Sequence, residues 1–424
     1  IQAGSGHIAN VSQVGDDNVS LVDQLLNDNT ANVNQDDMGG EVDGNDSMVF
    51  QTAQFGEANV TQLNAGNTSI VNQSGVGVGP VGTGGVVNVT QTDAAGFGSL
   101  STVNQSGDNN VTTVSQDGSN DGMGAYGSTV NQSGSFNATT FSQVGNDNIG
   151  DITQTGVSNT IEGLGGAPTQ MGDLNTMTVT LQQGDGGLIG AQQNGNSNTA
   201  TFEQDSSTYG ASRPASSLKS AQAGDLNTVS VVQGAPGTVP SIAESDVLSG
   251  QFGNSNQAAI IQVTDTGYVG NLQQGDFNNS TINQLGNDLV AEVTQDSTGM
   301  MGAFNLSTVN QGNITNADGG VIEVIQIGSN VSDVTQVASN LNPSPNTSTA
   351  TVYQGASGAP ATGNTSMLEQ RGDDLTGFVN QTGNDNTSTI YQDGLTNSAT
   401  LIASGDGNTS TITQADLAGF SNTA

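Results

Sequence analysis

The chain has 424 residues, of which 39 are acidic and 3 are basic, so its formal net charge is −36. This charge excludes nucleic-acid binding and disfavours docking on anionic lipid, because both depend on lysine and arginine. Hydrophobic residues are only 32% of the chain, Cys and Trp are absent and glycine occurs 60 times, which excludes a thick aliphatic core. No apolar run reaches the ~18 residues of a transmembrane helix.

One spacing recurs along the chain, Q-x-G-x-x-N-x-x-x-x-x-Q, with a period of 11 residues. Nine full copies begin at Gln13, Gln105, Gln132, Gln143, Gln193, Gln222, Gln251, Gln273 and Gln381. In near copies that begin at Gln284 and Gln370, Leu289 and Leu375 replace the asparagine, and the copy that begins at Gln392 ends on Ala403. Such repetition predicts stacked, nearly identical structural units.

Each copy contains a strand and a turn. From asparagine to glutamine the residues alternate with period 2, as Asn110, Thr112, Val114 and Gln116 do on one face, which is typical of a strand. Glycine and Asn or Asp between the first glutamine and the asparagine favour a tight turn. The predicted turn glycines are Gly15, Gly107, Gly134, Gly145, Gly195, Gly224, Gly253, Gly275 and Gly383.

Insertions separate some of the repeats. All eight prolines lie between predicted strands, in Gly-, Ser- and Ala-rich insertions such as Asp205–Ala221, as expected because proline removes a ladder hydrogen bond. From Gln105 onward the insertions mostly follow alternate strands. We therefore predict one all-β domain over residues 1–424, a β-solenoid of about 15 stacked strand-turn-strand rungs with cross-β stacking.

In-register stacking would place like amides above one another and join them in hydrogen-bonded ladders. The predicted ladder residues are Gln13, Asn18, Gln24, Gln105, Asn110, Gln116, Gln132, Asn137, Gln143, Asn148, Gln154, Gln193, Asn198, Gln204, Gln222, Asn227, Gln233, Gln251, Asn256, Gln262, Gln273, Asn278, Gln284, Gln381, Asn386 and Gln392. The sequence contains no evident cap for the end strands, and such edges add further copies head to tail.

With an alanine two residues after the asparagine, this pattern is the hallmark of the curlin repeat. The chain resembles the curli major subunit family of bacterial biofilm fibres over most of residues 7–414. Matching positions are Gln13, Gly15, Asn18 and Gln24 near the start, and Gln381, Gly383, Asn386 and Gln392 near the end. The resemblance implies outer-membrane export of an unfolded chain, a nucleating partner, assembly at the cell surface, and roles in adhesion and the biofilm matrix.

The residue types present disfavour other functions. A single histidine (His7), no cysteine and three basic residues do not form a catalytic constellation, so no enzyme and no catalytic or cofactor-binding residue is predicted. Acidic turns such as GDDN could bind Ca²⁺ loosely, but no specific metal site is predicted. Thr-rich faces suggest ice binding only if their rows are regular, and these rows are irregular.

Several short motifs follow from the repeat itself. Arg371-Gly372-Asp373 spells a cell-adhesion tripeptide within a predicted turn, and we read it as coincidence. Asn-x-Ser/Thr triplets at Asn10, Asn18, Asn59 and Asn67 resemble glycosylation acceptors, but a stacked core would bury them. His7 is expected on the surface, and Arg213 and Lys219 in one loop, paired with nearby acids.

The sequence thus predicts a secreted structural subunit that assembles with itself into extracellular, amyloid-type fibres. The alternative is a β-helical surface adhesin or matrix protein that does not polymerise. The predicted partners are further copies of the chain, a nucleator and the export machinery.

Overall fold

The computed structural model describes residues 1–37, 44–64, 66–75, 84–92, 98–118, 127–164, 169–182, 186–205, 216–234, 246–263, 267–285, 289–299, 303–312, 320–337, 348–355, 361–371, 375–394 and 397–415. These residues form short strands joined by turns, so the fold is all-β as predicted. Within these ranges no helix combines the length and apolar character needed to cross a bilayer. The chain divides into two compact units, Ile1–Arg213 and Pro214–Ala424, each described by itself.

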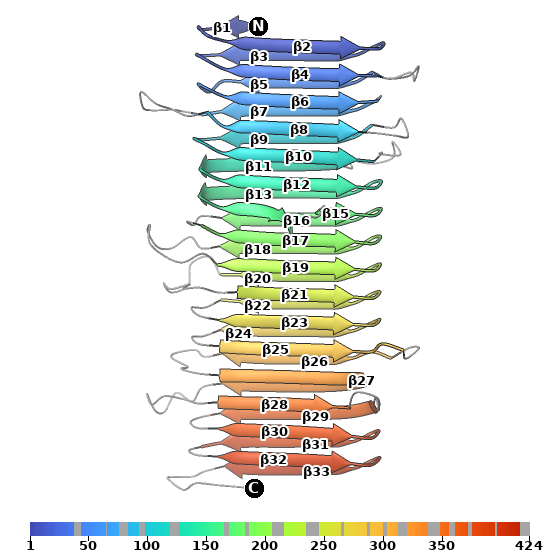
Figure 1. The fold of residues 1–424 in the computed structure, drawn as a ribbon. Coiled ribbons are helices and arrows are strands. Elements are labelled where there is room, and N and C mark those ends of the chain that lie inside the picture. Colours follow the sequence, from blue (N-terminus) through green and yellow to red (C-terminus); the bar gives the residue numbers. More distant parts are fainter. Residues whose placement is uncertain are drawn as a thin grey trace. The chain divides into compact units, whose positions relative to one another are not determined.

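The first unit contains two parallel stacks of strands, which we call sheets A and B (Figure 1). Sheet B is formed by β2 (Ile8–Val14), β4 (Thr30–Asp36), β6 (Glu57–Leu63), β8 (Val86–Thr92), β10 (Val111–Asp117), β12 (Ala138–Val144), β14 (Thr160–Gly163) with β15 (Gln170–Met171), and β17 (Leu188–Asn194). Sheet A is formed by β1 (Gln2–Ala3), β3 (Val19–Leu25), β5 (Asp46–Gln51), β7 (Thr68–Ser74), β9 (Leu100–Ser106), β11 (Gly127–Ser135), β13 (Ile149–Val157), β16 (Thr176–Gln182) and β18 (Thr199–Asp205).

The second unit repeats this plan. Its sheet B is formed by β19 (Ser217–Ala223), β21 (Asp246–Phe252), β23 (Tyr268–Gln274), β25 (Leu289–Asp296), the first part of β27 (Gly320–Val337), β28 (Ser348–Gln354), β30 (Thr376–Thr382) and β32 (Ser398–Ser404). Its sheet A is formed by β20 (Thr228–Gln233), β22 (Gln257–Gln262), β24 (Asn279–Leu285), β26 (Leu306–Gly312), the second part of β27, β29 (Ala361–Arg371), β31 (Thr387–Asp393) and β33 (Thr409–Ala415).

A B strand and the A strand that follows it form one rung, and successive rungs lie about 4.8 Å apart. The described residues of each unit contain eight such rungs, in line with the predicted β-solenoid of about 15. The register places residues of similar character on neighbouring strands beside each other: Val114 pairs with Phe141, and Gln116 with Gln143.

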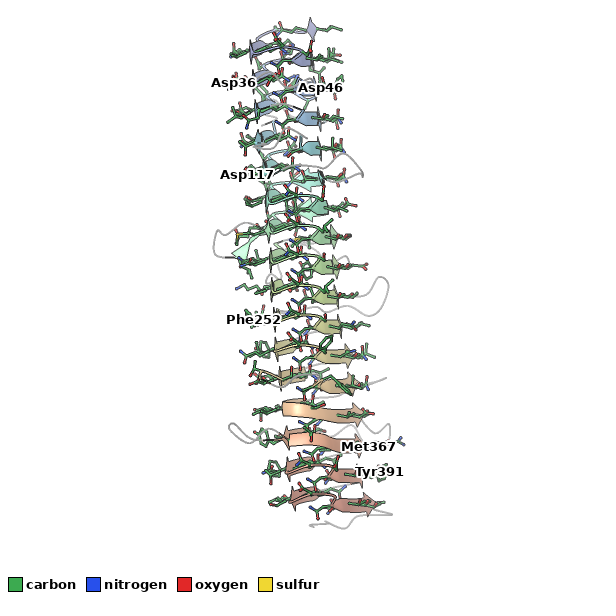
Figure 2. The ribbon with its side chains drawn as sticks, turned by 90° about the vertical axis from the view of Figure 1, so that its right-hand side faces the viewer. Asp36, Asp46, Asp117, Phe252, Met367 and Tyr391 are labelled. Carbon is green, nitrogen blue, oxygen red and sulfur yellow. The ribbon has the colours of Figure 1, made fainter. Side chains whose placement is uncertain are left out.

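The core is a thin layer between sheets A and B, as the alternating pattern predicts. In β10 the inward residues Thr112, Val114 and Gln116 are buried, and the outward ones are at least partly exposed. The large apolar residues Phe141 and Ile152 are fully buried. Figure 2 views the sheets edge on, with Asp36 and Asp117 pointing outward from one side and Asp46 from the other. Because the apolar layer is only one residue deep from each sheet, polar hydrogen bonds must contribute much of the specificity.

Two details of the predicted insertions need correction. β19 begins at Ser217, inside the expected insertion Asp205–Ala221, because Ser217–Ala223 pairs in full register with β21. Lys219 therefore lies on a strand, not in a loop with Arg213, which is outside the described residues. The eight prolines and Gly372-Asp373 also lie outside them.

Short connections are found at both edges, so the predicted placement of insertions after alternate strands holds only in part. In the second unit, short turns join B to A strands, as between β19 and β20 or β30 and β31, but connections of three or four residues also join A to B strands, as between β24 and β25 or β31 and β32. In the first unit short turns likewise join A to B strands, as between β9 and β10 or β11 and β12. Four residues are enough to connect the two sheets at either edge of a rung, as between β19 and β20 or β9 and β10. Neither edge therefore requires a long insertion.

Candidate functional site

The glutamine side chains at the strand ends form continuous amide ladders. In sheet B of the first unit, each Nε2 donates to the Oε1 of the next glutamine at 2.7–2.9 Å, in the order Gln13, Gln35, Gln62, Gln91, Gln116, Gln143, Gln170 and Gln193. In sheet A the order is Gln2, Gln24, Gln51, Gln73, Gln105, Gln132 and Gln154. All the bonds run in one direction, so each ladder is polar.

The second unit contains the same two ladders. Sheet B joins Gln222, Gln251, Gln273, Gln295, Gln326, Gln354 and Gln381. Sheet A joins Gln233, Gln262, Gln284, Gln311, Gln336, Gln370, Gln392 and Gln414. Within sheets A and B, the structure therefore brings the predicted glutamines together with others that the pattern did not include.

Several glutamines, such as Gln13, Gln24, Gln62 and Gln381, also close their own turn. Gln62 Nε2 donates to the carbonyl oxygen of Asn67 at 3.0 Å and to that of Asp46 on the facing sheet at 2.9 Å. Because the side chain is fully buried, these bonds replace water. The glutamines thus link successive rungs, the two sheets and the turn.

Two residues interrupt the ladders. Leu181 lies between Gln154 and Gln204 in sheet A of the first unit. Ala403 lies beside Gln381 in the last described B strand, and there Gln381 Nε2 donates to Ser388 Oγ instead, at 2.9 Å. Ala403 was visible in the sequence as an incomplete copy, whereas Leu181 lies outside every matched copy.

The asparagines stack in a different way from the glutamines. Asn110 Oδ1 accepts the backbone N–H of Asn137 at 3.0 Å, and Asn110 Nδ2 donates to the carbonyl oxygens of Ser106 and Gly134 at 2.8 and 3.0 Å. Asparagine amides therefore join one turn to the next through the backbone. At some rungs they also bond amide to amide as predicted, as when Asn278 Nδ2 donates to Asn256 Oδ1 at 3.0 Å. All the predicted asparagines except the half-buried Asn18 are buried.

The predicted turn glycines all have positive φ, between +84° and +121°. Two residues after each of them stands a second positive-φ residue, at 54–60°: Asp17, Asn109, Phe136, Asp147, Ser197, Leu226, Ser255, Phe277 and Asp385. This geometry lets the turn backbone keep bonding along the stack, as when Gly145 N–H donates to the Asp117 carbonyl oxygen at 2.9 Å. The turns are thus part of the stacked structure.

Sequence reasoning missed a polar column between these two positive-φ positions. Asp173 Oδ1 accepts the backbone N–H of Asn146 at 2.7 Å, and Asn196 Oδ1 accepts that of Asp173 at 2.8 Å. In the second unit Asp225, Asn254 and Asp276 repeat the arrangement. Asp and Asn alternate from rung to rung, so neighbouring carboxylates are separated, and the Asn or Asp that recurs after the turn glycine was the available signal.

Sequence reasoning also missed ladder glutamines where insertions break the 11-residue spacing, such as Gln35, Gln91 and Gln326. A β-branched residue two positions earlier, as in Val33, Val89 and Val324, was the signal that could have identified them. Leu289 and Leu375 occupy asparagine positions as fully or nearly fully buried side chains.

Two expectations about single residues are wrong. Asn10 and Asn59 are not buried: they face outward and form a surface column in which Asn10, Asn32, Asn59 and Asn88 bond in turn at 2.8–2.9 Å. They stand at the third position of their strands, which points away from the core. His7 is half-buried, and both ring nitrogens are shielded without a hydrogen-bond partner among the described residues.

The outermost described strands have unpaired edges. Among the described residues, β2 pairs with β4 only, β32 with β30 only and β33 with β31 only. β1 covers part of the edge of β3, through Gln2 and Ala3 beside Gln24 and Leu25. Val11 in β2 is 47% exposed, whereas the equivalent Val33 is 2% exposed, so the end rung leaves core residues uncovered.

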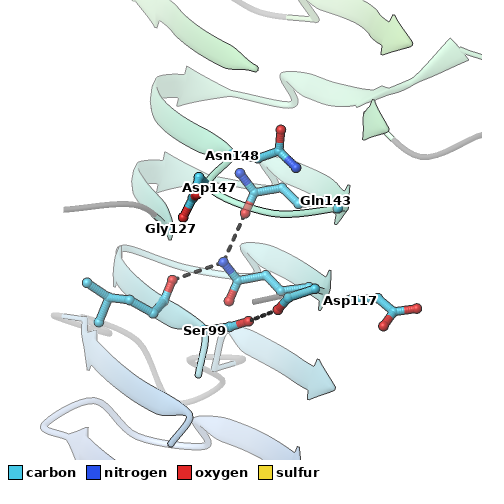
Figure 3. Close-up of a pocket in the computed structure, with 10 residues that line it drawn as sticks. Ser99, Asp117, Gly127, Gln143, Asp147 and Asn148 are labelled. Atoms are coloured by element: carbon cyan, nitrogen blue, oxygen red, sulfur yellow. Dashed lines mark hydrogen bonds between the residues drawn. The ribbon is translucent and has the colours of Figure 1, made fainter. Parts of the chain in front are cut away.

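A small cavity lies beside the sheet B ladder of the first unit. This cavity, of about 20 Å³ beside Gln116 and Gln143 (Figure 3), has room for about one water molecule. Its floor is the ladder itself: Gln116 donates to Gln143 and to the Leu100 carbonyl oxygen, both at 2.9 Å. The described residues contain no group of three His, Asp or Glu side chains that could hold a metal ion.

Comparison with known proteins identifies the repeat. The family model of the curlin associated repeat matches residues 361–394 and 384–415, which span β29 to β33. No curated protein matches the chain. The predicted resemblance is confirmed at these two C-terminal copies, and their side-chain ladders, which join Gln370, Gln392 and Gln414, are the same as those of the preceding rungs.

Proposed function

Because the chain carries curlin associated repeats, we propose that it is the structural subunit of an extracellular, amyloid-type fibre in which copies add head to tail. The observation that carries the proposal is the pair of end rungs. Among the described residues they have unpaired strand edges. Both polar ladders begin at the first rung, with Gln2 and Gln13, and the sheet A ladder reaches the last described rung at Gln414. A contact of this heterologous kind does not close, and it therefore generates a filament.

The two end rungs offer complementary hydrogen-bonding groups. Asn386 Oδ1 accepts the backbone N–H of Asn408 at 3.0 Å, and in the last described turn Asn408 Oδ1 occupies the equivalent accepting position. In the turn between β2 and β3 the corresponding donor is the backbone N–H of Asn18. The joint would repeat the internal bond, with Asn408 of one copy accepting from Asn18 of the next.

The strand edges match in the same register. β32 would pair with β2, placing Leu401 on Val11, and β33 would pair with β3, placing Gln414 on Gln24. β1 holds the edge of β3 through only two residues, so the seven residues of β33 would displace it. Burying a side chain such as Val11 contributes about 1.5 kcal/mol, which favours the joint.

Roles in adhesion and the biofilm matrix, export across an outer membrane and a nucleating partner belong to the same proposal, and the family resemblance supports them. Self-assembly is the part that the geometry supports best.

Gly405→Ala tests the joint. Gly405 is the turn glycine of the last described rung, with φ +91°, and the nearest atom to an added Cβ is Asn408 Nδ2 at 3.8 Å. At the equivalent Gly383 the added Cβ would lie 2.4 Å from the carbonyl oxygen of Gly405 in the next rung. In the fibre Gly15 of the next copy would take that place, so the alanine methyl would block the joint while the free chain still folds.

We expect G405A to retain the circular dichroism of the native chain and to slow seeded fibre elongation at least about tenfold, since a blocked joint costs more than about 1.4 kcal/mol. Gly299→Ala is the matched control, because Gly299 has φ +77° and nothing within 4 Å of an added Cβ, and it lies in a turn of an internal rung. Elongation of G405A at the rate of G299A would contradict head-to-tail addition at this rung.

A further inference from the structure

The outer face of sheet B in the second unit carries a group of aromatic and acidic side chains, which we call the aromatic–acidic strip: Tyr268, Glu292, Glu323, Tyr353 and Phe378. They stand on β23, β25, β27, β28 and β30, which are successive neighbours in the sheet. Glu292 is exposed and the other four are half-buried. The chain has 5 tyrosines in 424 residues, so two on one face is a local concentration.

At one end of the strip, the Tyr268 ring lies on the sheet beside Glu292. A Cβ added at Gly270 would be 3.1 Å from the Tyr268 hydroxyl oxygen and 3.5 Å from Glu292 Cγ. The ring therefore lies along its own strand above Gly270, with the Glu292 carboxylate beside it. Burial, followed by the charges of Glu292 and Asp246, raises the pKa of Tyr268.

The second half is built around Tyr353. Its hydroxyl donates to Glu323 Oε2 at 2.6 Å, and this bond, with burial and the charge of Glu323, raises the pKa of Tyr353. The Tyr353 and Phe378 rings meet edge to face, with centroids 5.7 Å apart. Glu292 and Glu323 are register partners on adjacent strands, and like charges in that position repel each other. The strip thus places two adjacent carboxylates between two tyrosine rings.

Sheet A of the same unit contains a similar pair of an acid and a tyrosine, and an arginine contacts both. On β29 and β31, Glu369 is the register partner of Tyr391. The Arg371 guanidinium pairs with Glu369 at 2.5 Å and lies 5.9 Å from the Tyr391 ring centroid. Figure 2 shows Tyr391 on the outer face of that sheet, with Phe252 projecting from sheet B on the other side. There the cation is supplied by the chain itself.

Sheet B has no such cation within reach among the described residues. Lys219 stands on the same outer face, but three strands before Glu292, about 14 Å along the stack. A second copy of the chain is a poor source as well, because each copy has only three basic residues, one of which is Arg371. Among the described residues, the chain therefore supplies no cation to the strip.

We propose that the aromatic–acidic strip binds an arginine-rich peptide segment of a partner protein, whose guanidinium groups lie on the tyrosine rings and pair with Glu292 and Glu323. Arginine fits better than lysine because its planar guanidinium both stacks on aromatic rings and pairs bidentately with a carboxylate. The strip is independent of the end rungs, so the proposal does not rest on fibre formation.

The test measures binding of a short labelled oligo-arginine peptide to the freshly dissolved full chain by fluorescence anisotropy at physiological ionic strength. We expect Glu292→Gln with Glu323→Gln to weaken binding about fivefold. Tyr268→Leu with Tyr353→Leu leaves the net charge unchanged and should weaken binding by a similar factor, about fivefold, through loss of the rings. Oligo-lysine should bind more weakly than oligo-arginine.

The matched control is Asp151→Asn with Glu203→Gln. These two acids of the first unit are separate, and their register partners are threonines. The control removes the same two charges and should change affinity less than about twofold. Equal weakening by the control and by the Glu292 and Glu323 variant would show general attraction to an acidic surface, and it would overturn the proposal. Unchanged binding by the tyrosine variant would overturn it too.

Discussion

Replacing Gly134 by alanine is expected to lower the free energy of unfolding of the first unit by about 3 kcal/mol, from backbone strain together with overpacking. Gly134 has φ +104°, and its added Cβ would lie 1.9 Å from the carbonyl oxygen of Gly156 in the next rung. That atom is backbone and is held by its own stack, so it cannot move aside as a flexible side chain would. The loss is measured by urea unfolding of the freshly dissolved chain.

Gly405→Ala is the control for this experiment, since it changes the equivalent turn glycine at a position where the nearest described atom to an added Cβ, Asn408 Nδ2, lies 3.8 Å away. It carries the strain of positive φ alone, about 1 kcal/mol. If the two variants unfold at the same urea concentration, the close contact between stacked turns is not the reason why glycine is required at Gly134.

Replacing Gln62 by alanine is expected to cost a similar amount, about 3 kcal/mol, because several buried polar groups lose their partner at once. Gln62 accepts from Gln35 and donates to Gln91, both at 2.9 Å, and it also donates to the carbonyl oxygens of Asp46 and Asn67. In a core one side chain deep, water cannot reach these groups. Thermal and urea unfolding of the variant measure the loss.

Asn59→Ala provides the comparison on the same strand. Asn59 also bonds to its neighbours in a column, at 2.8–2.9 Å, but it faces outward and is only partly buried. Water can replace its bonds, so the expected loss is below about 1 kcal/mol. A loss as large as that of the Gln62 variant would mean that burial does not set the contribution of the ladder.

The all-β fold and the turn glycines were predictable because both follow from local spacing. Gly15 and Gly383 stand at opposite ends of the sequence, yet both follow their glutamine by two residues, and both have positive φ. The alternation around Val114 was likewise sufficient to place core and surface. Where copies follow one another directly, the sequence therefore specifies strand, turn and face.

What could not be predicted depends on register across insertions or on neighbours in other rungs. The sequence predicts a loop over the first part of β19, because its partner, β21, follows only after an intervening strand and a long insertion. Leu181 interrupts a ladder whose other members lie in separate rungs. The aromatic–acidic strip was invisible for the same reason: Glu292 and Glu323 are 31 positions apart in the numbering and become adjacent only through strand pairing.

The central claim, that copies add end to end and continue the stack, is tested most directly by X-ray diffraction from an aligned pellet of the full chain after incubation in moderate salt. The account predicts fibres that give a sharp reflection at about 4.8 Å along the axis and a diffuse one at about 10 Å across it. A chain that stays soluble and monomeric while its circular dichroism shows β structure would contradict the claim. The chain would then be a β-helical surface protein that does not polymerise.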